Sequence, residues 1–167
     1  MQNAYFELIK KTINNGMRRQ DREIPHEEAI GLLDKGEYGV LSMSTPANEG
    51  YGIPLNYILY NDELYFHCAT AGFKVETLRN NNKVSFCVVG KTKVLPNDFG
   101  TLYESVIVAG ITSEVDGSAK IEVLKQFMVK YYGECNREGI EYINKLHEKV
   151  IVIKMVIKSV SGKARKQ

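Results

Sequence analysis

The stretch most suggestive of chemistry runs from Leu64 to Lys74 and reads LYFHCATAGFK. A predicted strand ends there in a histidine and a cysteine, a turn of small residues follows, and Lys74 falls in the first turn of a predicted helix. Free backbone N–H groups and the helix dipole at such a turn favour an anion, and Lys74 adds a full positive charge. The pattern indicates a phosphate cradle and hence a phosphorylated ligand. The alternative is that Gly72 only shapes the turn and that Lys74 is solvated.

The two polar residues at the end of this strand, His67 and Cys68, are adjacent in the sequence. Adjacent side chains in a strand point to opposite faces, so these two cannot act together. A single histidine in a strand is more often a packed or surface residue than a catalyst. A nucleophilic role for Cys68 needs a base on its own face, and the sequence identifies none.

A second stretch, Gly52 to Tyr60, reads GIPLNYILY. Pro54 has no N–H to donate to a sheet, which predicts an edge strand, a bulge or the opening of a strand. The amide of Asn56 suits the polar edge of a flat heterocycle, while its neighbours Leu55 and Tyr57 suit the ring face. The alternative is an edge strand with a solvent-facing asparagine.

A third stretch, Thr101 to Gly110, reads TLYESVIVAG and places Tyr103, Glu104 and Ser105 at the start of an apolar strand. Polar residues in this position often line the mouth of a barrel. Glu104 has no carboxylate close in the sequence, which argues against paired-carboxylate chemistry. Neither glycine-rich nucleotide-binding motif occurs, so nucleotide hydrolysis and Rossmann-type binding are disfavoured.

Composition narrows the class of protein further. The chain has 167 residues, a net charge of +2 and scattered basic residues, which predicts one globular domain without a nucleic-acid interface. The longest apolar run, Val150 to Val160, is too short to span a membrane, and no secretory signal is visible, so we expect a cytoplasmic protein. Three dispersed cysteines predict buried free thiols, and three dispersed histidines predict no metal site.

Hydrophobic periodicity and turn residues divide the chain into helices and strands. The predicted helices are Ala4–Asn14, His26–Lys35, Phe73–Arg79, Ala119–Tyr132 and Arg137–Leu146. The predicted strands are Tyr38–Ser44, Tyr51–Tyr60, Glu63–Cys68, Lys83–Lys91, Thr101–Val115 and Lys149–Val160. Asn61 and Asp62 predict a tight hairpin turn, because both tolerate positive φ.

This order of elements predicts a mainly β, α+β fold, an antiparallel barrel decorated by helices, because early strands follow one another through tight turns without βαβ alternation. Residues 17–167 would form this single domain. Residues 1–16 would form an N-terminal extension.

Six motifs occur together in one order: MRRQDREIP, GEYGVLS, GIPLNYILY, LYFHCATAGFK, VSFCVVG and TLYESVIVAG. As a set they resemble the 5-nitroimidazole resistance branch of the pyridoxamine 5'-phosphate oxidase-like proteins. The resemblance is strong from Met17 to Gly110 and looser in the closing strand. It implies an FMN-binding split β-barrel that works as a homodimer, with the flavin held at the subunit interface.

The resemblance also implies roles for particular residues. The segment Ile53, Pro54, Leu55, Asn56 and Tyr57 matches the strand that contacts the flavin ring, and Ser105 matches a polar residue that reaches the ring. His67 and Cys68 match the strand end beside the ribityl and phosphate, and Lys74 matches the phosphate-binding lysine. His67 also matches a histidine near bound ligand, which makes it the first candidate for a role on the substrate side. Phe73 departs from the polar or basic residue that relatives commonly carry, so one phosphate contact is missing.

The function implied is that of an FMN-dependent oxidoreductase acting on a small nitroaromatic or related acceptor, in which the flavin carries the redox chemistry. Two alternatives stay open. One is a non-catalytic flavin- or haem-binding barrel, and the other is a pyridoxamine 5'-phosphate oxidase proper.

Overall fold

The computed structural model describes residues 17–166, so the predicted helix Ala4–Asn14 lies outside the described residues. The helices are α2 (His26–Lys35), α3 (Phe73–Asn80), α4 (Gly117–Tyr132) and α5 (Arg137–Leu146), with short 3-10 helices η1 (Gln20–Arg22), η2 (Pro96–Asp98) and η3 (His147–Lys149). The strands are β1 (Tyr38–Ser44), β2 (Gly50–Asn56), β3 (Ile58–Tyr60), β4 (Glu63–Ala69), β5 (Lys83–Leu95), β6 (Gly100–Val115) and β7 (Val150–Arg165).

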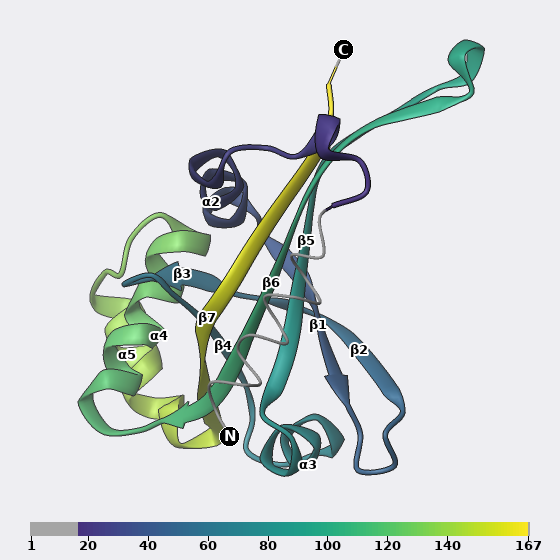
Figure 1. The fold of residues 1–167 in the computed structure, drawn as a ribbon. Coiled ribbons are helices and arrows are strands. Elements are labelled where there is room, and N and C mark those ends of the chain that lie inside the picture. Colours follow the sequence, from purple (N-terminus) through teal and green to yellow (C-terminus); the bar gives the residue numbers. More distant parts are fainter. Residues whose placement is uncertain (1–16, 167) are drawn as a thin grey trace.

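The strands form one seven-stranded sheet in the order β2-β1-β5-β6-β7-β4-β3, with every neighbouring pair antiparallel. Its two edges, β2 and β3, follow each other in the chain and are separated by Tyr57 alone. The sheet is therefore strongly curled, and the chain itself joins its edges (Figure 1). This is the predicted antiparallel split barrel, open between β2 and β3.

The turn and edge signals of the sequence are confirmed. Pro54 lies in β2, an edge strand, where its missing N–H breaks no ladder on the open side. Asn61 and Asp62 adopt φ values of 49° and 60° in the hairpin between β3 and β4. The predicted single strand Tyr51–Tyr60 is wrong in one respect, because it divides at Tyr57. The hydroxyl of Tyr131 in α4 binds both the N–H and the carbonyl of Tyr57 at 3.0 and 2.8 Å, in place of a strand partner.

The main core fills the inside of the curled sheet. This core includes Leu41, Phe86 and Val108. Leu41 of β1 is paired with Phe86 of β5, which is paired in turn with Val108 of β6. Leu33 of α2 and Leu78 of α3 pack into the same core, and the two helices lie toward opposite ends of the sheet (Figure 1). Burial of these apolar side chains is the main stabilising term of the fold.

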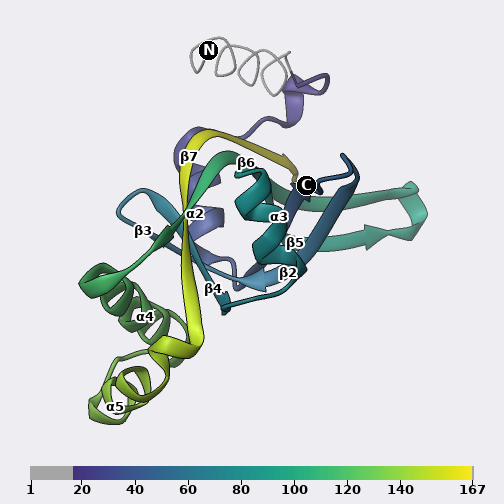
Figure 2. The ribbon, with the colours of Figure 1, turned by 90° about the horizontal axis from the view of Figure 1, so that it is seen from below.

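A second hydrophobic cluster forms on the other face of β3, β4 and β7. It joins these strands to α4 and α5 through Ile58, Tyr65, Val123, Leu124, Phe127, Ile143 and Val152. The two helices stand to one side of the sheet in both views (Figures 1 and 2). This packing positions the wall of the cavity described below.

Two strands run further than their sequences predict. β5 continues to Leu95, beyond its predicted end at Lys91, and pairs there with Gly100 at the start of β6, so the tip of this hairpin projects from the body of the molecule (Figures 1 and 2). The tip exposes Phe99 almost completely, at 99%. β7 runs on to Arg165 because it stays paired with β6 as far as Tyr103. None of the helices in residues 17–166 is both long and apolar enough to cross a membrane.

The three cysteines, Cys68, Cys87 and Cys135, are free, as expected. Each is partly rather than fully buried.

Candidate functional site

His67 and Cys68 lie on opposite faces of β4, as the alternation of a strand requires. The His67 ring meets the edge of Phe127 in α4, with ring centroids 4.7 Å apart and planes at 84°. Cys68 packs against the main core on the other face. The structure therefore gives His67 a place in a helix-lined cavity and keeps Cys68 outside it.

The turn after β4 has the geometry of an anion site. Gly72 adopts φ 124°, a conformation that side chains rarely tolerate, and it is the N-cap of α3. No described side chain caps this helix, and its first internal bond runs from the Glu76 N–H to the Gly72 carbonyl. The preceding N–H groups of the first turn therefore remain available as donors, at the positive end of the helix dipole.

Lys74 stands in the first turn of α3, half-buried and close to the end of β4. Its positive charge partly offsets the rise in the pKa of Cys68 that burial causes. Its charge also reaches His67, whose pKa is lowered first by burial and then by Lys74. His67 is thus a neutral imidazole at pH 7, able to donate one hydrogen bond and accept another.

The predicted ring-binding segment of β2 alternates between two faces. Ile53 and Leu55 are partly buried against the main core, whereas Pro54 and Asn56 lie exposed on the outer face of the sheet. The side chain of Tyr57 is completely buried, and its hydroxyl donates to the Leu33 carbonyl. Only the outward residues of this segment present side chains that a ligand could touch.

Asn56 is held in place at the junction of β2 and β3. Its Nδ2 donates to the Glu37 carbonyl at 3.0 Å, which leaves its side-chain oxygen as an acceptor. The Tyr131 hydroxyl approaches the same carbonyl at 2.5 Å. Burial raises the pKa of Tyr131, so the phenol stays protonated and keeps the junction fixed.

Ser105 lies on the same outer face but far along it. Ser105 is paired with Val89 of β5. Strand β1 lies between β5 and β2, the strand that ends in Asn56. Three strand spacings put Ser105 roughly 14 Å from Asn56. Its partner on β7 is Lys163, and a hydrogen bond from the Arg22 guanidinium, with a further effect of the Lys163 charge, lowers the pKa of Tyr103 two residues away. Ser105 therefore belongs to a separate basic region of the sheet.

A cavity with a volume of about 590 Å³ lies between the α4–α5 pair and the end of β4. It is lined by Asn56, His67, Leu124, Phe127, Met128, Tyr131, Tyr132, Tyr142, Ile143, Leu146, His147, Lys149 and Val150. The structure thus brings together two of the predicted residues, Asn56 and His67, in one aromatic cavity. Lys74 does not line this cavity.

Sequence reasoning missed the helical wall of this cavity. The spacing of α4 and α5 predicts helices, and the apolar face of each helix is expected to pack on the sheet. Leu124, Phe127 and Ile143 do pack in the second hydrophobic cluster, but they also line the cavity, and only the tertiary arrangement reveals this second role. Tyr132 and Tyr142 remain exposed beside the cavity, a feature that only the structure shows.

Comparison with known proteins supports the split-barrel fold. The family model described as pyridoxamine 5'-phosphate oxidase matches residues 25–164. A search of curated proteins finds no match.

Several solved structures are similar to this chain at low sequence identity. One, described as a candidate 5-nitroimidazole antibiotic resistance protein from Bacteroides thetaiotaomicron, has a TM-score of 0.72 and 19% identity over 85% of this chain and 86% of its own. An FAD-binding protein from Mesorhizobium loti has a TM-score of 0.63 and 20% identity over 87% of this chain and 98% of its own. A flavocytochrome from Azotobacter vinelandii has a TM-score of 0.69 and 17% identity over 90% and 72% of the two chains. With a matching family model across most of its length and this shared architecture, the chain belongs to the pyridoxamine 5'-phosphate oxidase family.

Proposed function

We propose that this protein binds FMN and uses it to reduce a small aromatic acceptor, such as a nitroaromatic compound. The observation that carries the proposal is the uncapped start of α3, where Gly72 and Lys74 form an anion cradle shortly after β4, the strand that carries His67. Structural neighbours described as FAD-binding and as a flavocytochrome support a flavin as the ligand.

The cradle fits a phosphate in charge and in shape. A Cβ built on Gly72 would meet nothing within 4 Å, so the space beside the turn is open. An incoming phosphate would accept hydrogen bonds from the free N–H groups and from the Lys74 ammonium. Phe73 contributes no further polar contact, and it packs instead on Tyr51 of β2, with ring centroids 5.0 Å apart.

The outer face of β2 suits the ring of the flavin. Pro54 and Asn56 are exposed there, and the free side-chain oxygen of Asn56 can accept a hydrogen bond from a ring N–H. The inward residues Ile53, Leu55 and Tyr57 would not touch the ring. They would hold the strand in place by packing against the main core.

When bound, the flavin would supply the electrons, and the chain's own residues would position the acceptor. The cavity beside His67 is large enough for a small aromatic molecule and is lined mostly by apolar and aromatic side chains. The neutral His67 ring can hold a polar substituent of the acceptor by a hydrogen bond. We therefore assign His67 to the substrate side.

A homodimer is part of the same proposal. Four apolar side chains, Tyr38, Val40, Val89 and Ile107, share the outer face of β1, β5 and β6 and are 38–63% exposed. An exposed apolar patch of this kind favours association with a second copy. A dimer should be visible by light scattering, and Ile107→Lys should convert it to a monomer.

The direct test is the visible spectrum of the purified protein, followed by titration with FMN and FAD. We expect a yellow protein, or saturable uptake of FMN in preference to FAD, and oxidation of a reduced nicotinamide by nitroaromatic acceptors. A colourless protein that takes up neither flavin would contradict the proposal.

A second candidate is a flavin- or haem-binding protein without turnover. It is favoured by one observation, that His67 and His147 both line the cavity and could approach an iron centre. Binding without turnover, with a haem absorbance band lost in His67→Ala, would support this alternative. A pyridoxamine 5'-phosphate oxidase proper is tested by adding that substrate, and absence of oxidation would remove it.

A further inference from the structure

We infer that the cavity between α4, α5 and β4 binds a planar aromatic carboxylate, with the rings among the aromatic side chains and the carboxylate at Lys149. The inference deepens the proposed function, because it names the class of acceptor that the flavin would reduce. The binding step itself does not depend on flavin.

The shape and lining of the cavity favour an aromatic ligand. Its volume of about 590 Å³ lies within the ordinary range for small-molecule sites. Phe127 forms an apolar wall in the interior, with Tyr131 stacked nearly parallel to it at 13° and 6.1 Å between centroids. Tyr132 and Tyr142 also line the cavity, yet they remain 77% and 59% exposed. Large aromatic side chains left open to water beside a cavity are typical of a site that a flat ligand covers.

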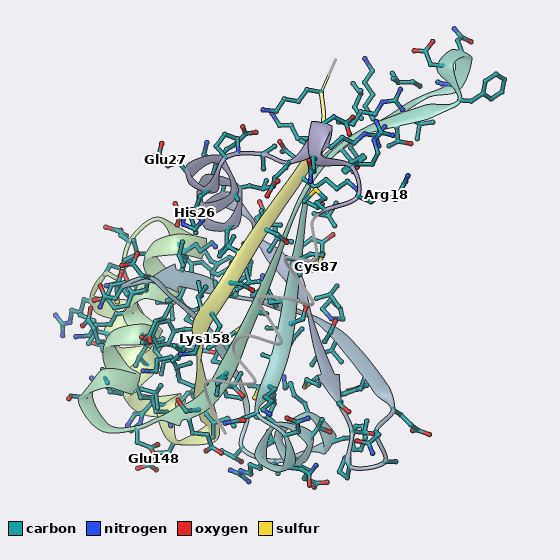
Figure 3. All side chains as sticks on the ribbon, viewed as in Figure 1. Arg18, His26, Glu27, Cys87, Glu148 and Lys158 are labelled. Carbon is teal, nitrogen blue, oxygen red and sulfur yellow. The ribbon has the colours of Figure 1, made fainter. Side chains whose placement is uncertain are left out.

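The charge of the lining favours an anion. None of the described lining residues is acidic, whereas Lys149 contributes an ammonium group. His147 contributes a second imidazole ring besides that of His67, and it can donate or accept a hydrogen bond. Lys149 forms no ion pair with any residue in the described part of the chain. The adjacent Glu148 is exposed and projects away from the body of the molecule (Figure 3). A carboxylate on the ligand would supply the missing partner of Lys149.

The separation of the polar groups sets the size of the ligand. His67 is paired with Val152 of β7, and Lys149 precedes Val152 by three residues. Lys149 ends η3 immediately before β7, so only the two steps from Val150 to Val152 are extended strand, at about 3.3 Å each, and the two backbone positions lie at most roughly 10 Å apart. One or two fused rings fit between them, with the carboxylate near Lys149 and a reducible substituent near His67 and Asn56. The acceptor would then lie beside the proposed flavin ring.

Calorimetric titration with two probes tests this assignment. The probes are naphthalene-2-carboxylate and its uncharged amide, naphthalene-2-carboxamide, each added to flavin-free protein. We expect the carboxylate to bind more tightly than the amide. In Lys149→Gln the affinity for the carboxylate should fall about tenfold, which is the scale of one charge-assisted hydrogen bond, while affinity for the amide stays within about twofold. In Tyr142→Ala both probes should bind more weakly.

The matched control is Lys145→Gln, which removes an exposed lysine of α5 that does not line the cavity and should leave both affinities unchanged. Equal affinity for the two probes, or no binding of either, would overturn the inference. So would a Lys149→Gln variant that loses affinity for FMN but not for the carboxylate, because Lys149 would then belong to the phosphate cradle. Failure of the proposed function is separate, since it would appear as loss of flavin uptake with probe binding intact.

Discussion

Replacement of Lys74 by alanine removes the one full positive charge assigned to the phosphate cradle. The free N–H groups behind Gly72 remain in the variant, so the loss is that of one charge-assisted hydrogen bond, about 1.5–3 kcal/mol. Because about 1.4 kcal/mol corresponds to a factor of ten, the affinity for FMN should fall roughly 10- to 150-fold. The affinity for riboflavin, which lacks the phosphate, should stay nearly constant.

Flavin fluorescence quenching measures both affinities, and Lys120→Ala provides the control. Lys120 also stands in the first turn of a helix, α4, but it is remote from the His67 cavity lining. Its variant should bind FMN like the parent protein. An equal loss of affinity for FMN and riboflavin in Lys74→Ala would refute the reasoning, because the lysine would then act on the fold or on the ring instead of the phosphate.

Three further predictions concern the support of the site. Tyr131→Phe should lower the free energy of unfolding in urea by about 1–2 kcal/mol, because the Tyr57 backbone loses its hydroxyl partner. The control Tyr132→Phe, at an exposed position, should change it by less than about 0.5 kcal/mol. Gly39→Ala should destabilise by about 1–3 kcal/mol, because the added Cβ would lie 2.5 Å from the ring of Phe86, and an unchanged urea midpoint would contradict this. Because the pKa of His67 is lowered in the folded protein, the folded state is stabilised by the neutral ring above about pH 6.5, and this contribution is lost as the pH falls below that value. Between about pH 8 and pH 5.5, the free energy of unfolding should therefore fall less in His67→Gln than in the parent protein.

Local sequence signals determined most of the fold. Helices α2 and α5 and strand β1 have the predicted bounds, since each is delimited by a residue type with a strong local preference, such as Gly36 after α2. The edge position of β2 followed from Pro54, and the turn before β4 from Asn61 and Asp62. These features depend on one or two neighbouring residues, which is why a single sequence reveals them.

Long-range contacts determined the rest. The break at Tyr57 depends on a hydroxyl 74 residues away, and no local pattern records it. The long hairpin of β5 and β6 depends on pairing across the strands, so Lys91 was wrong as the end of β5.

The candidate site also has one part that depends on neighbouring residues and another that depends on long-range contacts. The cradle at Lys74 is local, because a turn and the start of a helix build it. The cavity needs α4, α5, β4 and the β2–β3 junction at once, so its aromatic wall could not be predicted from spacing. Ser105 matches the family pattern but lies roughly three strand spacings from Asn56, and its role in ring binding stays a prediction.

A crystal structure of the protein with FMN tests the central claim most directly. The phosphate should lie within hydrogen-bond distance, about 3 Å, of the Lys74 ammonium and of the first backbone N–H groups of α3, with the ring on the outer face of β2 at Asn56. A phosphate bound instead at the basic region of Arg22 and Lys163, with the start of α3 left in water, would contradict the account.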